Sequence, residues 1–287
     1  MDAGSPEAPM SLRRPPIPPL RPFVAELWIS QPGTSLPGEG GGSRERVLPC
    51  AATHIAIRLD DVPIRLFDDD ADSTGRDLGV SIIGGARSGF YTKESGRSHC
   101  TIGAQLRPGA ARALFGVHAS QLSERHTRLD DLWGMAVATL REQLVAQRSD
   151  IRRLAMFETF LAARIPQPRG MHPAIAQALE DLEAGAGVRE AVAASGYSHR
   201  RFIALFDDAV GLTPKRYSRV LRFQSLVRRA RRQPSLFWSE LALDAGYSDQ
   251  SHFIREFRAL AGITPEDYRR LSLLHHDHLP IGVGTPT

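Results

Sequence analysis

The chain has 287 residues, which is enough for two domains that each bury a core of their own. A hydrophobic fraction of 42% and a charged fraction of 24% are those of a soluble globular protein. The formal net charge of +4 is mildly basic, so any surface that binds nucleic acid must be local. Two cysteines, Cys50 and Cys100, exclude a disulfide framework and a four-thiolate zinc site.

No stretch of the sequence approaches the roughly 20 consecutive apolar residues of a membrane helix. The N-terminal segment also lacks the apolar run of a signal peptide. We therefore expect a cytoplasmic protein without membrane contacts. Residues 1–20 are rich in proline and are expected to be disordered.

The next part of the chain, up to about residue 106, is predicted to be rich in strands. Short runs with partial alternation of apolar and polar residues, such as FVAELWIS, THIAIRL and HCTIGAQL, are separated by stretches of turn-forming residues. Several short strands without long helices between them favour an antiparallel barrel or sandwich. Helical spacing follows in LDDLWGMAVATLREQLVAQRS and in DIRRLAMFETFLAARI.

The segment PQPRGMHP interrupts this pattern, and everything after it reads as helical. The predicted fold class is α+β, with an antiparallel β-barrel or sandwich-like domain and its following helices before an all-α domain. We place the strand-rich sensing or dimerisation domain at 21–166, a linker at 167–172 and the helical domain at 173–274. Residues 275–287, which include HHDHLP, are expected to form a disordered tail.

Two segments of the helical domain are nearly the same. ASGYSHRRFIALFDDAVGLTPKRY begins at Ala194, and DAGYSDQSHFIREFRALAGITPEDY begins at Asp244. The Gly-Tyr-Ser triplet, a phenylalanine, the Gly-x-Thr-Pro motif and a final tyrosine recur in both, with one residue added in the second copy. Matching of this density indicates an internal duplication.

Each copy predicts a short helix, a glycine turn and a second helix. Ser198 and Ser248 stand where N-caps of the second helices are expected. Each second helix has one apolar face and one polar face that carries cations, which is typical of a helix-turn-helix unit. Between the copies, KRYSRVLRFQSLVRRARR contains eight Lys or Arg and no acid. It predicts one long helix whose charge suits the neutralisation of phosphates.

The motifs ASGYSHRRFIALF, GLTPKRYSRVLRF, DAGYSDQSHFIREF and GITPEDYRR resemble the DNA-binding domain of the AraC/XylS family of bacterial transcription regulators. The resemblance implies two helix-turn-helix units on a rigid linker helix, with recognition helices in adjacent major grooves of double-stranded DNA. ERVLP, GAQLRPGAARALFGV and LDDLWG resemble an uncharacterised strand-rich domain of some members. RNA polymerase, a small-molecule effector and a second copy of the chain are further candidate partners.

The resemblance also implies which residues face DNA. The base-facing set is His199, Arg200, Ile203 and Ala204 in the first copy, and Asp249, Gln250, Ser251, Ile254 and Arg255 in the second. Residues expected near phosphates are Ser198, Arg219, Arg222, Ser248 and His252. Arg200 is the leading specificity candidate, since a guanidinium can bridge guanine O6 and N7. Arg219 and Arg222 have the alternative of pairing with acids inside the domain.

Other features have simpler interpretations. A helical solenoid that binds proteins would need three or more repeats, and this chain has two, so the sequence does not favour a solenoid. Four histidines in or just after the strand-rich region, His54, His99, His118 and His126, lack a close pair on one strand beside a carboxylate, so we expect neither a metal nor a cofactor. The cysteines are more typical of small core residues than of a redox pair. Arg228, Arg229, Arg231 and Arg232 suit a solvated face as well as they suit phosphates.

The sequence therefore predicts a transcription regulator that binds specific DNA and is modulated by an effector at its N-terminal domain. No Gly-x-Ser-x-Gly motif, phosphate loop or paired-carboxylate context is present, so we expect no enzyme. The alternative is an effector-binding or enzymatic β-barrel protein whose helical region serves protein–protein interaction.

Overall fold

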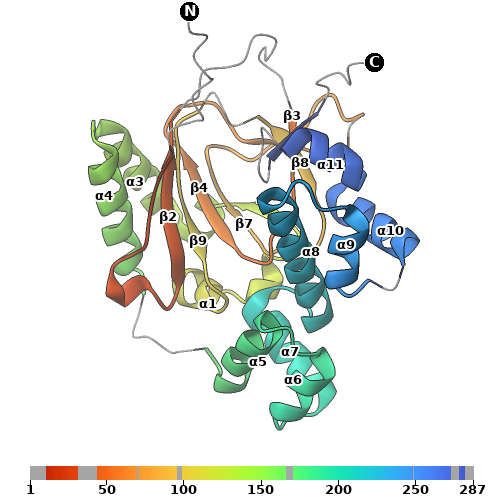
Figure 1. Ribbon diagram of the computed structural model, residues 1–287. Coiled ribbons are helices and arrows are strands. Elements are labelled where there is room, and N and C mark those ends of the chain that lie inside the picture. Colours follow the sequence, from red (N-terminus) through yellow and green to blue (C-terminus); the bar gives the residue numbers. More distant parts are fainter. Residues whose placement is uncertain are drawn as a thin grey trace, which may run out of the picture.

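The computed structural model describes residues 11–31, 44–69, 71–95, 99–165, 171–247, 249–272 and 278–281. Two sheets and their flanking helices are followed by a domain built of helices (Figure 1). This arrangement confirms the predicted α+β fold class. Among the described helices, none has the length and apolar character needed to cross a membrane.

The strands form two antiparallel sheets. The first sheet has the order β1 (Ser11–Arg14), β2 (Val24–Ser30), β9 (Thr101–Leu106), β4 (His54–Arg58), β7 (Ser81–Gly84) and β10 (His126–Arg128). The second has the order β11 (His278–Ile281), β3 (Arg44–Val47), β8 (Tyr91–Glu94), β5 (Arg65–Phe67) and β6 (Arg76–Asp77). The described strands therefore pair mainly with partners that are distant in the sequence.

The two faces of the first sheet pack against different layers, because successive side chains of a strand point to opposite sides. Ile55 and Ile57 of β4 lie in a core that includes helices α3 (Met135–Ala146) and α4 (Asp150–Ala162). Ala56, between them, packs with Leu66 of the second sheet. Figure 1 shows α3 and α4 on one side of the first sheet and the C-terminal helices on the other. Helix α1 (Ala110–Phe115) contributes to the same core as α3 and α4, and α2 (Asp130–Trp133) precedes α3 in the chain.

The helical domain contains two cores. Its helices are α5 (Pro173–Glu183), α6 (Val188–Ala194), α7 (His199–Val210), α8 (Pro214–Arg232), α9 (Trp238–Asp244), α10 (Gln250–Ala261) and α11 (Pro265–Ser272). Phe202 and Phe206 of α7 lie in the first core, and Phe253 and Phe257 of α10 lie in the second. We call α6–α7 the first unit, α9–α10 the second unit and α8 the linker helix.

The N-terminal segment is more ordered than predicted. Within 1–20, residues Ser11–Arg14 form β1 against β2, and Pro18–Leu20 form the short 3-10 helix η1. Contacts with distant parts of the chain order this segment: Leu20 is fully buried, and Arg14 pairs with Glu158 of α4 at 2.8 Å. Residues 1–10 lie outside the described part, as do residues 167–170 of the predicted linker.

The expected disordered tail requires a second correction. Residues 278–281 form β11, which pairs antiparallel with β3. Leu279 is 1% exposed and belongs to the core of the second unit, and the His278 Nδ1 atom lies 2.9 Å from the Glu45 Oε1 atom. An open strand edge offers unpaired backbone groups, and this segment pairs with them. The rest of the expected tail lies outside the described residues.

Candidate nucleic-acid interface

The first unit has the local geometry that its sequence predicts. Gly196, after α6, has φ +71°, a conformation that glycine adopts without steric cost. The Ser198 side chain caps α7 by accepting a hydrogen bond from the Arg201 amide at 3.4 Å. Behind this start, Phe202 and Phe206 are fully buried. The first turn of α7 is thus fixed from its apolar side.

The predicted base-facing residues of α7 differ in exposure. His199, Arg200 and Ala204 are exposed, whereas Ile203 is half-buried and packs against the core of the first unit. Arg200 forms no ion pair with another described residue. The exposed polar groups therefore gather at the N-terminal end of α7.

The second unit begins its recognition helix differently from the prediction. Asp249, rather than Ser248, is the N-cap of α10, and its carboxylate accepts a hydrogen bond from the His252 amide at 2.7 Å. Ser248 itself lies outside the described residues. The residue added in the second copy moves the helix start by one position, and a carboxylate there also complements the helix dipole. Asp249 therefore has a capping role in addition to any contact with bases.

The remaining residues of α10 lie on two faces. Phe253 and Phe257 are buried, while Gln250, Ser251 and Arg255 are exposed. His252 and Ile254 are half-buried. The exposed set again occupies the first turns of the helix, as in α7.

One carboxylate joins α10 to the linker helix. Glu256 is largely buried, and its Oε1 atom lies 3.0 Å from Arg222 Nη2 and accepts a hydrogen bond from the Tyr247 hydroxyl at 2.9 Å. Its Oε2 atom lies 3.6 Å from Arg219 Nε and 3.7 Å from His252 Nε2. Burial and the contact with Glu256 raise the pKa of the Tyr247 hydroxyl. We call these five side chains the Glu256 network.

The Glu256 network contains three residues that were expected near phosphates. Arg219, Arg222 and His252 share one counter-charge, so the alternative of pairing inside the domain is the one that the structure contains. Each arginine side chain still keeps about a third of its surface exposed. Glu256 was not singled out from the sequence, although an acid four residues after His252, in a domain whose linker helix has only basic charges, was a usable signal.

The C-terminal end of α7 rests on the strand-rich domain. The Gly109 amide donates a hydrogen bond to Ala209 O at 2.8 Å, and the Ser120 hydroxyl donates to Asp208 at 3.1 Å. The Ser123 hydroxyl donates to the Gly211 carbonyl oxygen. Ser120 lies in the 3-10 helix η3 (Ala119–Gln121). These contacts leave the first turn of α7, at its other end, free of the strand-rich domain.

The second unit also contacts the strand-rich domain. Leu48 belongs to the core of this unit. The Gln224 side chain of the linker helix donates a hydrogen bond to Pro49 O at 3.2 Å. Gly262 packs so closely on Phe90 that a Cβ there would lie 2.6 Å from its ring. Both units are therefore attached to one scaffold.

The other sequence features do not form a metal or redox centre in the described part of the chain. No group of three His, Cys, Asp or Glu side chains is placed to hold a metal there. Cys50 and Cys100 form no disulfide with each other and are half-buried, and burial raises the pKa of the Cys100 thiol. His99 pairs with Asp60 at 3.0 Å. His54 and His126, however, lie side by side across β7.

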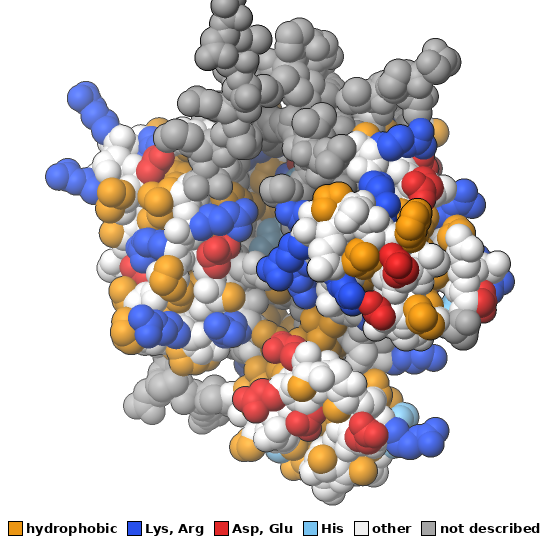
Figure 2. Space-filling view, in the orientation of Figure 1, with side chains coloured by type: hydrophobic (Ala, Val, Ile, Leu, Met, Phe, Trp, Pro, Cys, Tyr) orange, Lys and Arg blue, Asp and Glu red, His pale blue; other side chains and the backbone are white. Residues whose placement is uncertain are grey.

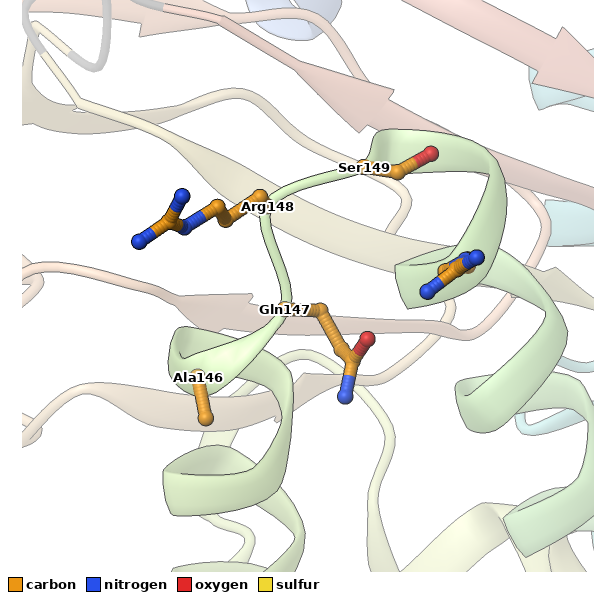
Figure 3. Close-up of a pocket in the computed structure, with 5 residues that line it drawn as sticks. Ala146, Gln147, Arg148 and Ser149 are labelled. Atoms are coloured by element: carbon orange, nitrogen blue, oxygen red, sulfur yellow. The ribbon is translucent and has the colours of Figure 1, made fainter.

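A surface hollow lies at the turn between α3 and α4. Its lining residues are Ala146, Gln147, Arg148, Ser149 and Arg152. Figure 3 shows the Gln147, Arg148 and Ser149 side chains pointing in different directions. Because its polar groups do not converge, this hollow has no feature of a binding site.

Comparison with known proteins assigns both halves of the chain. Residues 175–271 match the family described as a helix-turn-helix domain, and residues 12–128 match a domain of unknown function (DUF6597). No curated protein sequence matches the chain. The first match spans both units and the linker helix.

Among solved structures, those of ToxT from Vibrio cholerae match most of the length of this chain. The apo form of a ToxT variant has 8% identity, with 80% of this chain and 94% of that chain covered and a TM-score of 0.43. A 1.65 Å structure of ToxT has 11% identity, coverage of 81% and 95%, and a TM-score of 0.43. ToxT with a bound unsaturated fatty acid has 10% identity, coverage of 81% and 91%, and a TM-score of 0.42.

Two helix-turn-helix units on a basic linker helix, the family match and the recurring motifs of the two copies agree with one another. The chain carries a helix-turn-helix domain of the AraC type at residues 175–271 and a domain of unknown function at residues 12–128.

Proposed function

We propose that the first turns of α7 and α10 read bases in two adjacent major grooves of one DNA duplex. The observation that supports this most directly is that both helices bury two phenylalanines and expose their polar first turns. The major groove admits one such helix, and grooves on the same side of the duplex recur about every 34 Å. One chain thus contains both of the helices that contact bases in this proposal.

The proposed contacts follow the exposure of the side chains. Arg200 of α7 and Arg255 of α10 are the primary base contacts, with Gln250 and Ser251 beside Arg255. In the first groove, van der Waals contacts with the bases come from His199, Ile203 and Ala204. Ile254 makes such contacts in the second groove. Ser198 and Ser248 are assigned to the phosphates, whereas Arg219, Arg222 and His252 are held by Glu256 and reach phosphates only when that network opens. Asp249 caps the start of α10. Because its carboxylate can only accept hydrogen bonds, it disfavours base edges that present only acceptors to it.

The test is selection of binding sites from random duplexes by the purified full chain. Arg200→Ala should relax the preference at the bases of one groove by about 1 to 3 kcal/mol and leave the other groove unchanged. Arg201→Ala is the matched control, because Arg201 is an exposed arginine of the same turn on another side of the helix. An unchanged preference in the Arg200→Ala selection would show that the register of α7 is wrong.

We propose further that an effector bound by the strand-rich domain changes the affinity for DNA. Both units contact that domain, so a ligand with different affinities for two arrangements would shift the DNA-competent population. A second copy of the chain and RNA polymerase are the protein partners in this proposal. Sedimentation of the chain on its target duplex and retention of RNA polymerase on the same duplex test them separately.

A further inference from the structure

One short segment of the strand-rich domain, residues 48–51, contacts both helix-turn-helix units. Leu48 is 5% exposed and lies in the core of the second unit, together with Phe257 of α10. Ala51, three residues later, is 7% exposed and lies in the core of the first unit, together with Phe206 of α7. The segment therefore passes from the core of one unit to the core of the other.

The linker helix makes the same passage in the opposite direction. The buried residues of α8 up to Val220 belong to the core of the first unit, and those from Phe223 onward belong to the core of the second. The Gln224 side chain, at the change from one core to the other, donates a hydrogen bond to Pro49 O at 3.2 Å. Residues 48–51 thus run opposite to α8 in chain direction and meet it where the two units join.

The segment is itself fixed by the strand-rich domain. It follows β3 directly, and the Arg87 amide donates a hydrogen bond to the Cys50 carbonyl oxygen at 2.8 Å. Ala86, next to Arg87, is also buried and joins Ala51 in the core of the first unit. The position of the strand-rich domain is therefore transmitted to both units at this place.

The two units have separate cores. Among the described residues, no side chain of α9, α10 or α11 lies in the core of the first unit, and none of α5, α6 or α7 lies in the core of the second. In Figure 1, α8 runs between the two units, and Figure 2 shows the helices around α6 and those around α10 as separate lobes. The relative orientation of the recognition helices therefore depends on how each unit is held along α8.

We propose that residues 48–51 position the two recognition helices and so set the spacing between half-sites that the protein accepts on DNA. This inference rests on the proposed reading of two adjacent major grooves by α7 and α10. One extra base pair between the half-sites moves the second of them by about 3.4 Å along the duplex and by about 35° around its axis. Recognition helices that are held in a fixed relative orientation cannot follow this displacement, whereas helices released from the segment can follow part of it.

The test begins with selection of binding sites by the purified full chain. Affinities are then measured for the selected duplex and for duplexes with one base pair added or removed between the half-sites, and we call the ratio of affinities the spacing penalty. For the unchanged protein we expect a spacing penalty of at least about tenfold, because contacts with the bases of one half-site are lost. Since the penalty compares two duplexes on one protein sample, a fraction of unfolded protein cancels out of it.

Two variants act on opposite ends of the segment. Leu48→Ala combined with Gln224→Ala releases the second unit and the linker helix, and the spacing penalty should fall at least about threefold. Ala51→Leu adds volume against the core of the first unit, which a packed interior does not absorb without a shift. It should change the penalty by at least about threefold, and it carries the test if the first variant folds poorly. The base preferences within each half-site should stay the same in both variants.

Leu66→Ala is the matched control. Leu66 is 7% exposed, much like the residues of the segment, and it packs with Ala56 and Ile82 in a cluster that contains no described residue of either unit. The substitution should destabilise the strand-rich domain and leave the spacing penalty unchanged. An equal change of the penalty in Leu66→Ala would ascribe the effect to a general loss of stability and overturn the proposal.

The remaining outcomes separate this inference from the proposed function. A small spacing penalty in the unchanged protein, or the same penalty in both variants as in the unchanged protein, would overturn the role of residues 48–51. Either result, obtained with preferred bases in both half-sites, would leave the DNA-reading function standing. Selection without any preferred bases would reject the DNA-reading function and this inference with it.

Discussion

At the scale of single residues, Glu256 is the side chain on which the most contacts converge. It is 11% exposed and holds two arginines of the linker helix, a tyrosine and a histidine around one carboxylate. Breaking such a partly buried network by removing one member leaves charges without compensation. The same network also keeps positive charge away from phosphates.

Glu256→Gln tests this balance. The amide oxygen can still accept the Tyr247 hydrogen bond, but Arg219 and Arg222 lose their counter-charge and become available to DNA. We expect the slope of log K against log salt to become steeper by about one unit for each new phosphate contact. Glu266→Gln, at an exposed glutamate of α11, should leave the slope unchanged. An unaltered slope in Glu256→Gln would remove both arginines from the phosphate set.

At the scale of elements, β11 shows how a short segment far along the chain completes a sheet. Its four residues pair with β3, and Leu279 enters the core of the second unit. The strand therefore contributes both to the second sheet and to the packing of a DNA-reading unit. Its contribution to the free energy of unfolding should therefore be larger than that of an ordinary four-residue strand at a sheet edge.

Leu279→Ala is expected to lower the free energy of unfolding by about 2 to 5 kcal/mol, the usual cost of a leucine side chain in a closed core. Urea unfolding followed by fluorescence measures this change. Leu243→Ala removes the same atoms from a side chain that is 73% exposed, and it should change the stability by less than about 0.5 kcal/mol. Equal effects of the two substitutions would show that β11 does not pack as described.

At the scale of the whole molecule, the two halves of the chain share packing surfaces. Leu48 of the strand-rich domain lies in the core of the second unit, and the end of α7 is bonded to the segment around η3. A shared core makes unfolding of one half costly for the other. We expect a single cooperative thermal transition in calorimetry.

Leu48→Ala should separate this transition into two, because it removes apolar contact at the place where the halves meet. Leu12→Ala, at an exposed leucine of β1, is the control and should preserve one transition. Two transitions in the unchanged protein would mean that the halves fold independently and that Leu48 contributes little to their coupling.

The sequence alone predicted what local rules decide. The glycine turns, the Ser198 cap, the paired phenylalanines of α7 and α10 and the strand-rich first half are all present, because periodicity and capping act over a few residues. The pairing of β11 with β3, the order of β1 and the meeting of His54 with His126 depend on long-range register, which no single sequence displays. The Ser248 cap was wrong because one added residue moved the helix start.

The pairing of β11 with β3 has a consequence for biosynthesis. Residues 44–47 leave the ribosome early, yet one of their edges is paired only by residues 278–281. Until residues 278–281 have been synthesised, this edge of β3 presents an open row of backbone donors and acceptors, which is a template for pairing with other chains. Chains that lack residues 278–281 should therefore aggregate more readily than chains that contain them.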